Sequence, residues 1–151
     1  MNNSSIEAEL AEKGKIIYPN VGVSMRPLIK QGRDVMVIEK PQGRLKRYDG
    51  VLFIRRDGAY VMHRVLKVRE NDYVICGDNC IRKEYGITDD DVIGVLSAVI
   101  RNGREIKATD LSYRIYVHLW CDLFYLRIAV LWMLRAGKRV LRPIKRLFTK
   151  V

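Results

Sequence analysis

Short apolar runs separated by turn sequences occupy most of the chain, and this pattern limits how it can fold more than any other feature. The runs are rich in β-branched and apolar residues and resemble strands in length. Turns such as Arg56-Asp57-Gly58 and Asn102-Gly103 separate them. The predicted strands are residues 16–18, 34–39, 50–55, 60–68, 72–76 and 92–101. The pattern predicts a mainly β fold, a small coiled antiparallel domain over residues 16–110.

The character of the sequence changes after Asp110. Residues 111–134 are rich in Leu, Trp, Tyr and Phe without turn residues, and the chain then becomes strongly basic. Residues 123–151 contain eight Lys and Arg and no acid, so they carry eight of the eleven net positive charges. We expect a helical C-terminal extension over residues 111–151 and a polar arm or short helix over residues 1–15. A chain of 151 residues with 48% hydrophobic content supports one compact core.

A serine and a histidine far apart in the sequence suggest nucleophilic catalysis. Ser24 lies in the loop sequence Gly-Val-Ser-Met-Arg-Pro. A serine hydroxyl is a weak nucleophile that must pass its proton to a nearby base. His63 lies within a predicted strand, and an imidazole with a pKa of about 6.5 can serve as that base with little tuning. Ser24 and His63 are therefore the candidate nucleophile and general base.

A carboxylate often sets the tautomer of such a histidine and stabilises the imidazolium that forms during attack. Asp78 follows an apolar strand in a Gly-Asp-Asn turn, and Glu84 follows in the predicted loop 80–86. The sequence leaves open which of the two reaches His63.

Three short motifs, taken in order, resemble those of the superfamily of signal peptidase I and the self-cleaving SOS repressors. The likeness is to its archaeal and endoplasmic-reticulum branch, where a histidine replaces the lysine base. The motifs are Ser-Met-x-Pro at 24–27, His-Arg-Val at 63–65 and Gly-Asp-Asn at 77–79, within a resemblance that spans residues 17–104. This resemblance implies the peptidase fold, a serine endopeptidase activity and an oxyanion donor at the N–H of Ser24.

Two features depart from that family pattern. The histidine branch usually carries a second aspartate a few residues after Gly-Asp-Asn, and Glu84 stands there in this chain. Signal peptidases normally begin with a membrane-spanning anchor just before the serine, whereas residues 1–15 are short, polar and charged. We therefore expect cleavage of a leader or precursor peptide through an acyl-enzyme, rather than ordinary cleavage of export signals.

The aromatic and basic C-terminal segment predicts an anionic partner. Residues 115–134 are long enough to span a bilayer but contain His118, Asp122 and Arg127, whose insertion is costly. We expect a helix that lies on an anionic membrane surface or binds a partner protein, with the protein cytoplasmic and peripheral at the inner face of the membrane. His118 is expected to serve packing or an interface, and no nucleic-acid partner is expected.

A different class of function remains open, namely a non-catalytic adaptor that retains the peptidase fold and binds a membrane surface or nucleic acid. Cys76, Cys80 and Cys121 lack the spacing of a redox or zinc motif and are expected to be ordinary reduced residues. No cofactor and no metal is expected.

Overall fold

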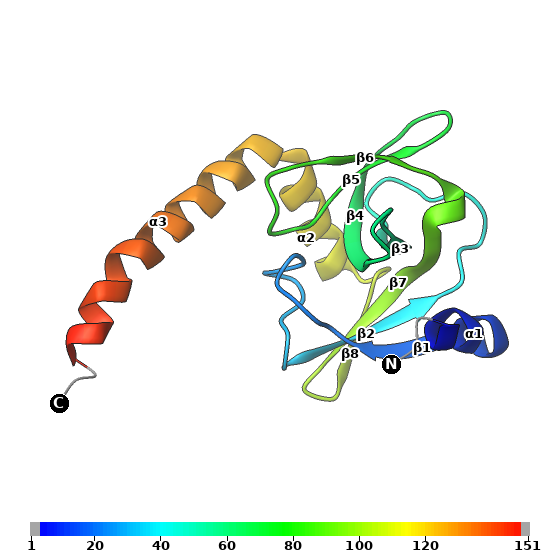
Figure 1. The fold of residues 1–151 in the computed structure, drawn as a ribbon, viewed down its shortest axis with the longest axis horizontal. Helices are drawn as coiled ribbons and strands as arrows, with labels where there is room; N and C mark the ends of the chain where they lie inside the picture. Colours follow the sequence, from blue (N-terminus) through cyan, green and yellow to red (C-terminus); the bar gives the residue numbers. More distant parts are fainter. Residues whose placement is uncertain (1–3, 149–151) are drawn as a thin grey trace.

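The computed structural model describes residues 4–148, with side chains for residues 6–134, 136 and 137. The chain begins with helix α1 (Ser4–Lys13), continues through the strands, and ends with helices α2 (Leu111–Asp122) and α3 (Phe124–Phe148) (Figure 1). The strands are β1 (Lys15–Pro19), β2 (Asp34–Glu39), β3 (Gly50–Ile54), β4 (Tyr60–Val68), β5 (Tyr73–Cys76), β6 (Glu84–Ile87), β7 (Val92–Arg101) and β8 (Arg104–Lys107). A short 3-10 turn (Asp89–Asp91) precedes β7.

The described strands form one sheet of eight, and every pairing in it is antiparallel. The order is β1-β2-β7-β3-β4-β5-β6, and β8 pairs with the far end of β7. Register shifts interrupt several ladders, for example between Val37 and Ile38 in β2 and between Leu52 and Phe53 in β3. Such bulges increase twist and let a sheet coil over its own core. The mainly β class and the C-terminal helices are confirmed.

Each of the six predicted strands is present, and no end differs from its predicted position by more than one residue. Two short strands, β6 and β8, were not predicted. The assignment of residues 80–86 to a loop was wrong in part, because Glu84 begins β6 and pairs with Ile75 of β5. The Glu-Tyr-Gly-Ile sequence of β6 lacks the alternation of apolar residues that marks a strand, and pairing with β5 provides its structure instead.

The sheet buries side chains on both faces. On β3, Val51 and Phe53 belong to one apolar cluster, whereas Leu52 between them belongs to the other. This division follows from the two-residue period of a strand. The larger cluster also contains Met25 and Ile29, so the long connection between β1 and β2 is anchored in the core although it is not a strand.

Helix α1 ends at a glycine, directly before β1. Leu10 is buried in the larger cluster, and Gly14 follows the helix with φ of 70° while its N–H donates to the carbonyl of Leu10. A glycine at this position ends a helix without the steric cost that a side chain would bring. The chain then turns directly into β1.

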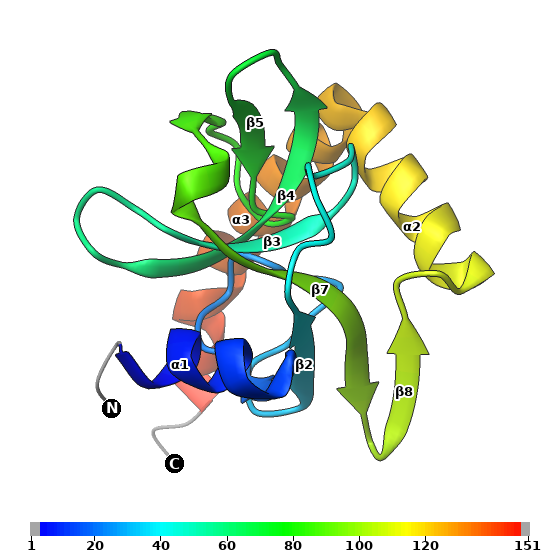
Figure 2. The same cartoon turned by 90° about the vertical axis from the view of Figure 1, so that its right-hand side faces the viewer.

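Helix α2 packs on the sheet, and α3 leaves it. Tyr113, Val117 and Cys121 of α2 are buried in the larger apolar cluster, so the core continues across the predicted boundary at residue 110. The chain bends by 88° between α2 and α3, and α3 then extends away from the sheet (Figure 1). In Figure 2 the same helix lies behind the β domain. Among the described residues no single helix is long and apolar enough to cross a membrane; only the bent pair formed by α2 and residues 124–134 meets that test, on length and composition.

Candidate functional site

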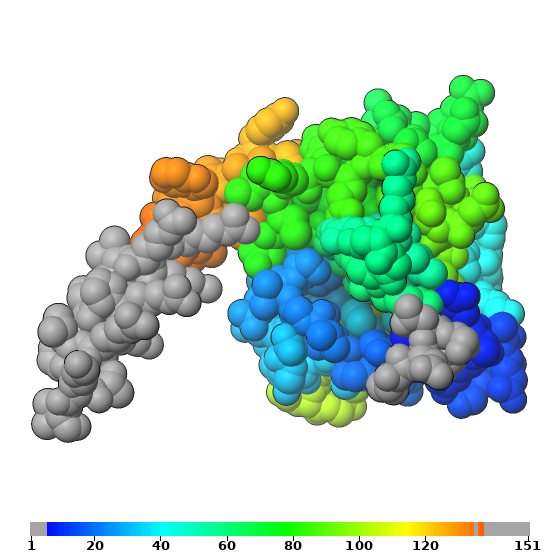
Figure 3. Space-filling model, viewed as in Figure 1, coloured from blue at the N-terminus to red at the C-terminus, as the bar shows by residue number. Residues whose placement is uncertain are grey.

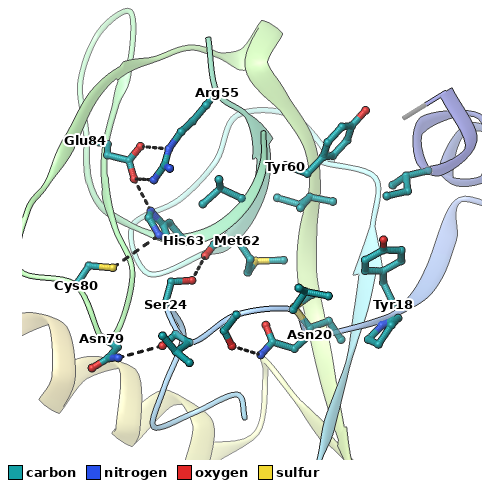
Figure 4. Close-up of a pocket in the computed structure, with 18 of the residues that line it drawn as sticks. Tyr18, Asn20, Ser24, Arg55, Tyr60, Met62, His63, Asn79, Cys80 and Glu84 are labelled. Atoms are coloured by element: carbon teal, nitrogen blue, oxygen red, sulfur yellow. Dashed lines mark hydrogen bonds and ion pairs between the residues drawn. The ribbon is translucent and has the colours of Figure 1, made fainter. Parts of the chain in front are cut away.

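A cleft of about 1010 Å³ brings three of the four candidate residues together. Ser24, His63 and Glu84 all line it, although they come from the β1–β2 connection, from β4 and from β6 (Figure 4). The remaining wall is largely apolar and includes Ile6, Tyr18, Met36, Leu52, Tyr60, Val61 and Met62. A concave, mostly apolar site with a few convergent polar groups is the usual form of a ligand site.

His63 is held on the central part of β4, opposite Val51 of β3. Only 2% of its surface is exposed. Its Nδ1 lies 2.7 Å from Oε1 of Glu84. The carboxylate lies away from the direction of the ring N–H, so this contact is an electrostatic pair and not a well-aligned hydrogen bond. Glu84 is therefore the carboxylate that faces the candidate base.

Glu84 is itself fixed by Arg55 at the end of β3. The guanidinium donates two hydrogen bonds, at 2.6 and 2.7 Å, to the two carboxylate oxygens. Burial alone would raise the pKa of Glu84, but the hydrogen bonds from Arg55 and the charges of His63 and Arg55 outweigh burial and hold it below its usual value. Glu84 is thus a carboxylate anion at neutral pH.

The pKa of His63 is lowered, and burial is the largest cause. The negative charge of Glu84 opposes this shift, while the positive charge of Arg55 adds to it. The neutral imidazole therefore predominates at pH 7, and a neutral imidazole is the form that accepts a proton.

Ser24 lies beneath the histidine ring in a loop that is tied to its neighbours (Figure 4). Its hydroxyl donates to the carbonyl of Met62, the residue before His63, over 3.5 Å. The backbone N–H of Asn79 donates to the carbonyl of Ser24 at 2.7 Å, and the Asn79 side chain donates to the carbonyl of Val23 at 3.1 Å. The Gly-Asp-Asn turn thus holds the serine loop against β4.

Gly77 allows this close packing. A Cβ atom at this position would lie 2.8 Å from the carbonyl oxygen of Ser24 and 2.9 Å from Cδ2 of His63. Both distances are shorter than a real Cβ atom tolerates, so any side chain here would displace one or both of these neighbours. The glycine of the motif therefore lets the backbone of the candidate nucleophile and the ring of the candidate base pack closely against one turn.

Cys80 is a site residue that the sequence interpretation treated as ordinary. Its Sγ lies 4.0 Å from Nε2 of His63, on the cleft side of the ring. The only sequence signal for this placement is its position directly after Gly-Asp-Asn. A second potential nucleophile therefore lies beside the candidate base.

Asp78 lies in the interior, away from His63. Arg64 donates from Nε and Nη2 to its two carboxylate oxygens, both at 2.8 Å, and neither residue is exposed. The carboxylate of Asp78 also accepts a hydrogen bond from the Tyr116 hydroxyl at 3.1 Å. This arrangement makes Asp78 part of a buried ion pair, and it leaves Glu84 as the partner of the histidine.

The C-terminal helices contact the same turn. Trp120 of α2 donates its indole N–H to the carbonyl of Asp78 at 2.7 Å. Arg64, the partner of Asp78, also donates to the Tyr113 hydroxyl of α2 at 3.1 Å. Arg127 of α3, which is buried, donates to the carbonyl of Cys80 at 3.0 Å. The turn at residues 77–80 is therefore held between the helices and the serine loop.

Within the described residues, no group of three or more His, Cys, Asp or Glu side chains is placed to hold a metal ion. His118 lies on the exposed side of α2, packs its ring on Tyr48 and pairs with Asp122 at 3.2 Å.

Comparison of the chain with protein-family models, with curated protein sequences and with solved structures gave no match.

Proposed function

We propose that the protein is a serine endopeptidase of the signal-peptidase type. Ser24 is the nucleophile, His63 the general base and Glu84 the carboxylate that orients and stabilises the histidine. The observation that carries the proposal is that a loop serine, a buried neutral histidine and an anionic glutamate from three separate segments line one cleft. Acyl transfer to a serine requires these three kinds of group to meet in one site.

In this mechanism Ser24 Oγ attacks the scissile carbonyl while Nε2 of His63 takes its proton. The negative charge on the carbonyl oxygen is stabilised by the backbone N–H of Ser24. Collapse of the tetrahedral intermediate breaks the peptide bond, and His63 returns the proton to the leaving amine. Water, activated by the same histidine, then hydrolyses the acyl-enzyme and regenerates Ser24.

In the substrate-free structure the Ser24 hydroxyl donates to the Met62 carbonyl. Catalytic hydrogen bonds are often loose without substrate and tighten in the complex. The Ser24 backbone and the His63 ring both pack against Gly77, which keeps the two residues beside the same turn.

We propose leader or precursor peptides as substrates, processed at the cytoplasmic face of the membrane. The open cleft and its apolar wall suit an extended peptide with apolar side chains near the cleavage site. The positive charge of residues 123–151 suits the anionic inner leaflet.

A direct test is to incubate the purified protein with a library of synthetic peptides and to identify the products by mass spectrometry. Ser24→Ala should abolish cleavage, with a loss of at least about 10,000-fold. Ser97→Ala is a matched control, because the Ser97 hydroxyl also donates to a backbone carbonyl, at 3.3 Å, but lies outside the cleft. Undiminished cleavage by folded Ser24→Ala, or no cleavage by the unmodified protein, would overturn the proposal.

A second candidate is a thiol peptidase in which Cys80 replaces Ser24, favoured by the 4.0 Å separation of its Sγ from Nε2 of His63. Cys80→Ser distinguishes the two candidates. We expect this variant to retain cleavage, since Ser24 remains. Loss of cleavage in Cys80→Ser with full cleavage in Ser24→Ala would assign the chemistry to the thiol. Full cleavage in both variants would exclude both nucleophiles, and no cleavage by the unmodified protein would favour a non-catalytic adaptor.

A further inference from the structure

The outer face of α2 carries apolar side chains that the protein does not cover. Leu111, Ile115 and Leu119 are 71%, 51% and 58% exposed. Their spacing of four residues places them along one side of the helix. The opposite side, with Tyr113, Val117 and Cys121, is buried in the core. Helix α2 is therefore apolar on two faces, and only one of them packs on the sheet.

The exposed apolar surface continues past the bend. Leu123, Tyr125 and Leu126 are 48%, 82% and 59% exposed. Further along α3, the exposed side chains include Trp132, Met133 and Leu134. Figure 3 shows the first turns of α3, in orange, standing out from the β domain. Soluble monomers rarely expose apolar side chains in such continuity, and where they do the surface usually binds something.

The charge around this surface is positive. Residues 123–151 contain eight Lys and Arg and no acid, and seven of these eight basic residues belong to α3, of which Arg127 is buried. Arg114 is exposed beside the stripe of α2. Asp122 is the acid at the bend, and Arg47 and His118 both pair with it, at 2.7 and 3.2 Å. A partner that matches this surface must be both anionic and able to accept apolar side chains.

We propose that the apolar surface of α2 and α3 binds the interface of an anionic lipid bilayer. A bilayer interface offers anionic headgroups above an apolar layer, which is the combination that this surface requires. Tryptophan and tyrosine, present here as Trp132 and Tyr125, favour that boundary. A nucleic acid would satisfy the positive charges but would leave the exposed leucines in water. This binding is independent of the proposed peptidase activity.

The 88° angle between α2 and the start of α3 affects how the β domain would be oriented on a membrane. A single interfacial helix can roll about its axis, whereas two that are not collinear fix the attached domain relative to the membrane plane. The domain would then be held on the membrane at a set orientation, with α2 and the first turns of α3 partly buried among the headgroups.

The proposal can be tested by sedimentation of the full-length protein with phosphatidylglycerol-containing vesicles and with pure phosphatidylcholine vesicles. We expect cosedimentation with the anionic vesicles at low salt, weaker cosedimentation at high salt, and little with the neutral vesicles. Ile115→Glu should reduce partitioning to anionic vesicles by about tenfold or more, because it removes an apolar side chain and adds a negative charge.

Ile17→Glu is the matched control. Ile17 is 61% exposed on β1, on a different part of the molecule, and the substitution makes the same change of volume and charge. This variant should bind anionic vesicles like the unmodified protein. Failure of the unmodified protein to bind, equal binding to neutral vesicles, or equal losses in the two variants would overturn the proposal. Self-association abolished by Ile115→Glu, without vesicle binding, would assign the surface to a second copy of the chain.

Discussion

His63 and Arg64 are neighbours on β4, yet they serve two different regions of the molecule. His63 faces the cleft and pairs with Glu84, whose side chain is 25% exposed. Arg64 points to the other side of the strand and pairs with Asp78, where both side chains are 0% exposed. Each region joins a nitrogen-bearing side chain to a carboxylate, but His63 is neutral at pH 7 and Arg64 is a cation. The first region opens to the cleft, and the second is enclosed by Tyr113, Tyr116 and Trp120.

The difference shows how one short motif can serve chemistry and architecture together. Consecutive residues of a strand point to opposite faces, so a His-Arg pair must divide its two side chains between two environments. The Gly-Asp-Asn turn is divided in the same way, because Gly77 contacts Ser24 and His63 while Asp78 neutralises Arg64. We therefore expect substitutions in the cleft to affect activity and substitutions in the buried pair to affect stability.

The largest expected effect is on activity. His63→Ala should reduce cleavage by about 100- to 10,000-fold, because it removes the group that accepts the proton of Ser24. His118→Ala is the control, since His118 also faces a carboxylate, Asp122, but outside the cleft. Steady-state rates of the two variants at pH 7 test this expectation. Comparable rates for both would mean that the His63–Glu84 pair has no special role.

The next effect is on stability. Asp78→Asn should lower the free energy of unfolding by about 3–5 kcal/mol, because the buried charge of Arg64 loses its counterion. Glu84→Gln should change stability far less, since Arg55 and Glu84 are partly exposed and water can solvate both. Urea unfolding followed by circular dichroism measures both values. Equal losses in the two variants would remove the distinction between the two regions.

A smaller effect concerns the contact between α2 and the Asp78 turn. Trp120→Phe deletes the indole N–H that donates to the carbonyl of Asp78. We expect a loss of about 1 kcal/mol in the free energy of unfolding, the usual net value of one hydrogen bond. Trp132→Phe is the control, because Trp132 is 68% exposed. A loss in Trp132→Phe as large as that in Trp120→Phe would contradict a structural role for this bond.

The smallest effect is a shift in pH dependence. Burial lowers the pKa of His63 below its usual value of about 6.5, so cleavage should stay high as pH falls to 6.5 and decline only below it. The charge of Glu84 raises this pKa, so Glu84→Gln should move the decline to still lower pH, on top of any fall in the plateau rate. Asp90→Asn, which changes an exposed carboxylate, should leave the pH at which cleavage declines unchanged. A decline that Glu84→Gln moves to higher pH would contradict the pairing.

The same pKa shift has a consequence for stability. A histidine whose pKa is lowered by folding binds fewer protons in the folded state than in the unfolded state. The contribution of His63 to the free energy of unfolding is fully present above the pKa of histidine in the unfolded chain. It is lost as pH falls below about 6.5.

Much of the sheet could be predicted from sequence, because its longer strands carry apolar and β-branched residues between clear turns. Residues 34–39, 60–68 and 92–101 are strands with the predicted ends. The short strand at Glu84 could not be predicted this way, since its register depends on β5 and not on its own residues. The sequence could place Asp78 and Glu84 near the site, but only the strand pairing selects Glu84 as the partner of His63.

The helical segment illustrates a second limit. Tyr113, Val117 and Cys121 share one helical face, and Leu111, Ile115 and Leu119 share another. Both faces are apolar, so periodicity alone cannot show which of them packs on the sheet. The aromatic residues of α2 entered the sequence interpretation as part of an extension, whereas the structure places three of them around the buried Arg64–Asp78 pair.

The most direct test of a Ser24–His63–Glu84 peptidase site is to identify the residue that carries the acyl group during turnover. The protein is mixed with a cleaved peptide, quenched in acid within the first turnover, digested, and analysed by mass spectrometry. We expect the acyl group on the fragment that contains Ser24, and its absence in Ser24→Ala. An acyl group on Cys80, which lies 4.0 Å from the same histidine, or cleavage without any acyl-enzyme, would contradict the assignment.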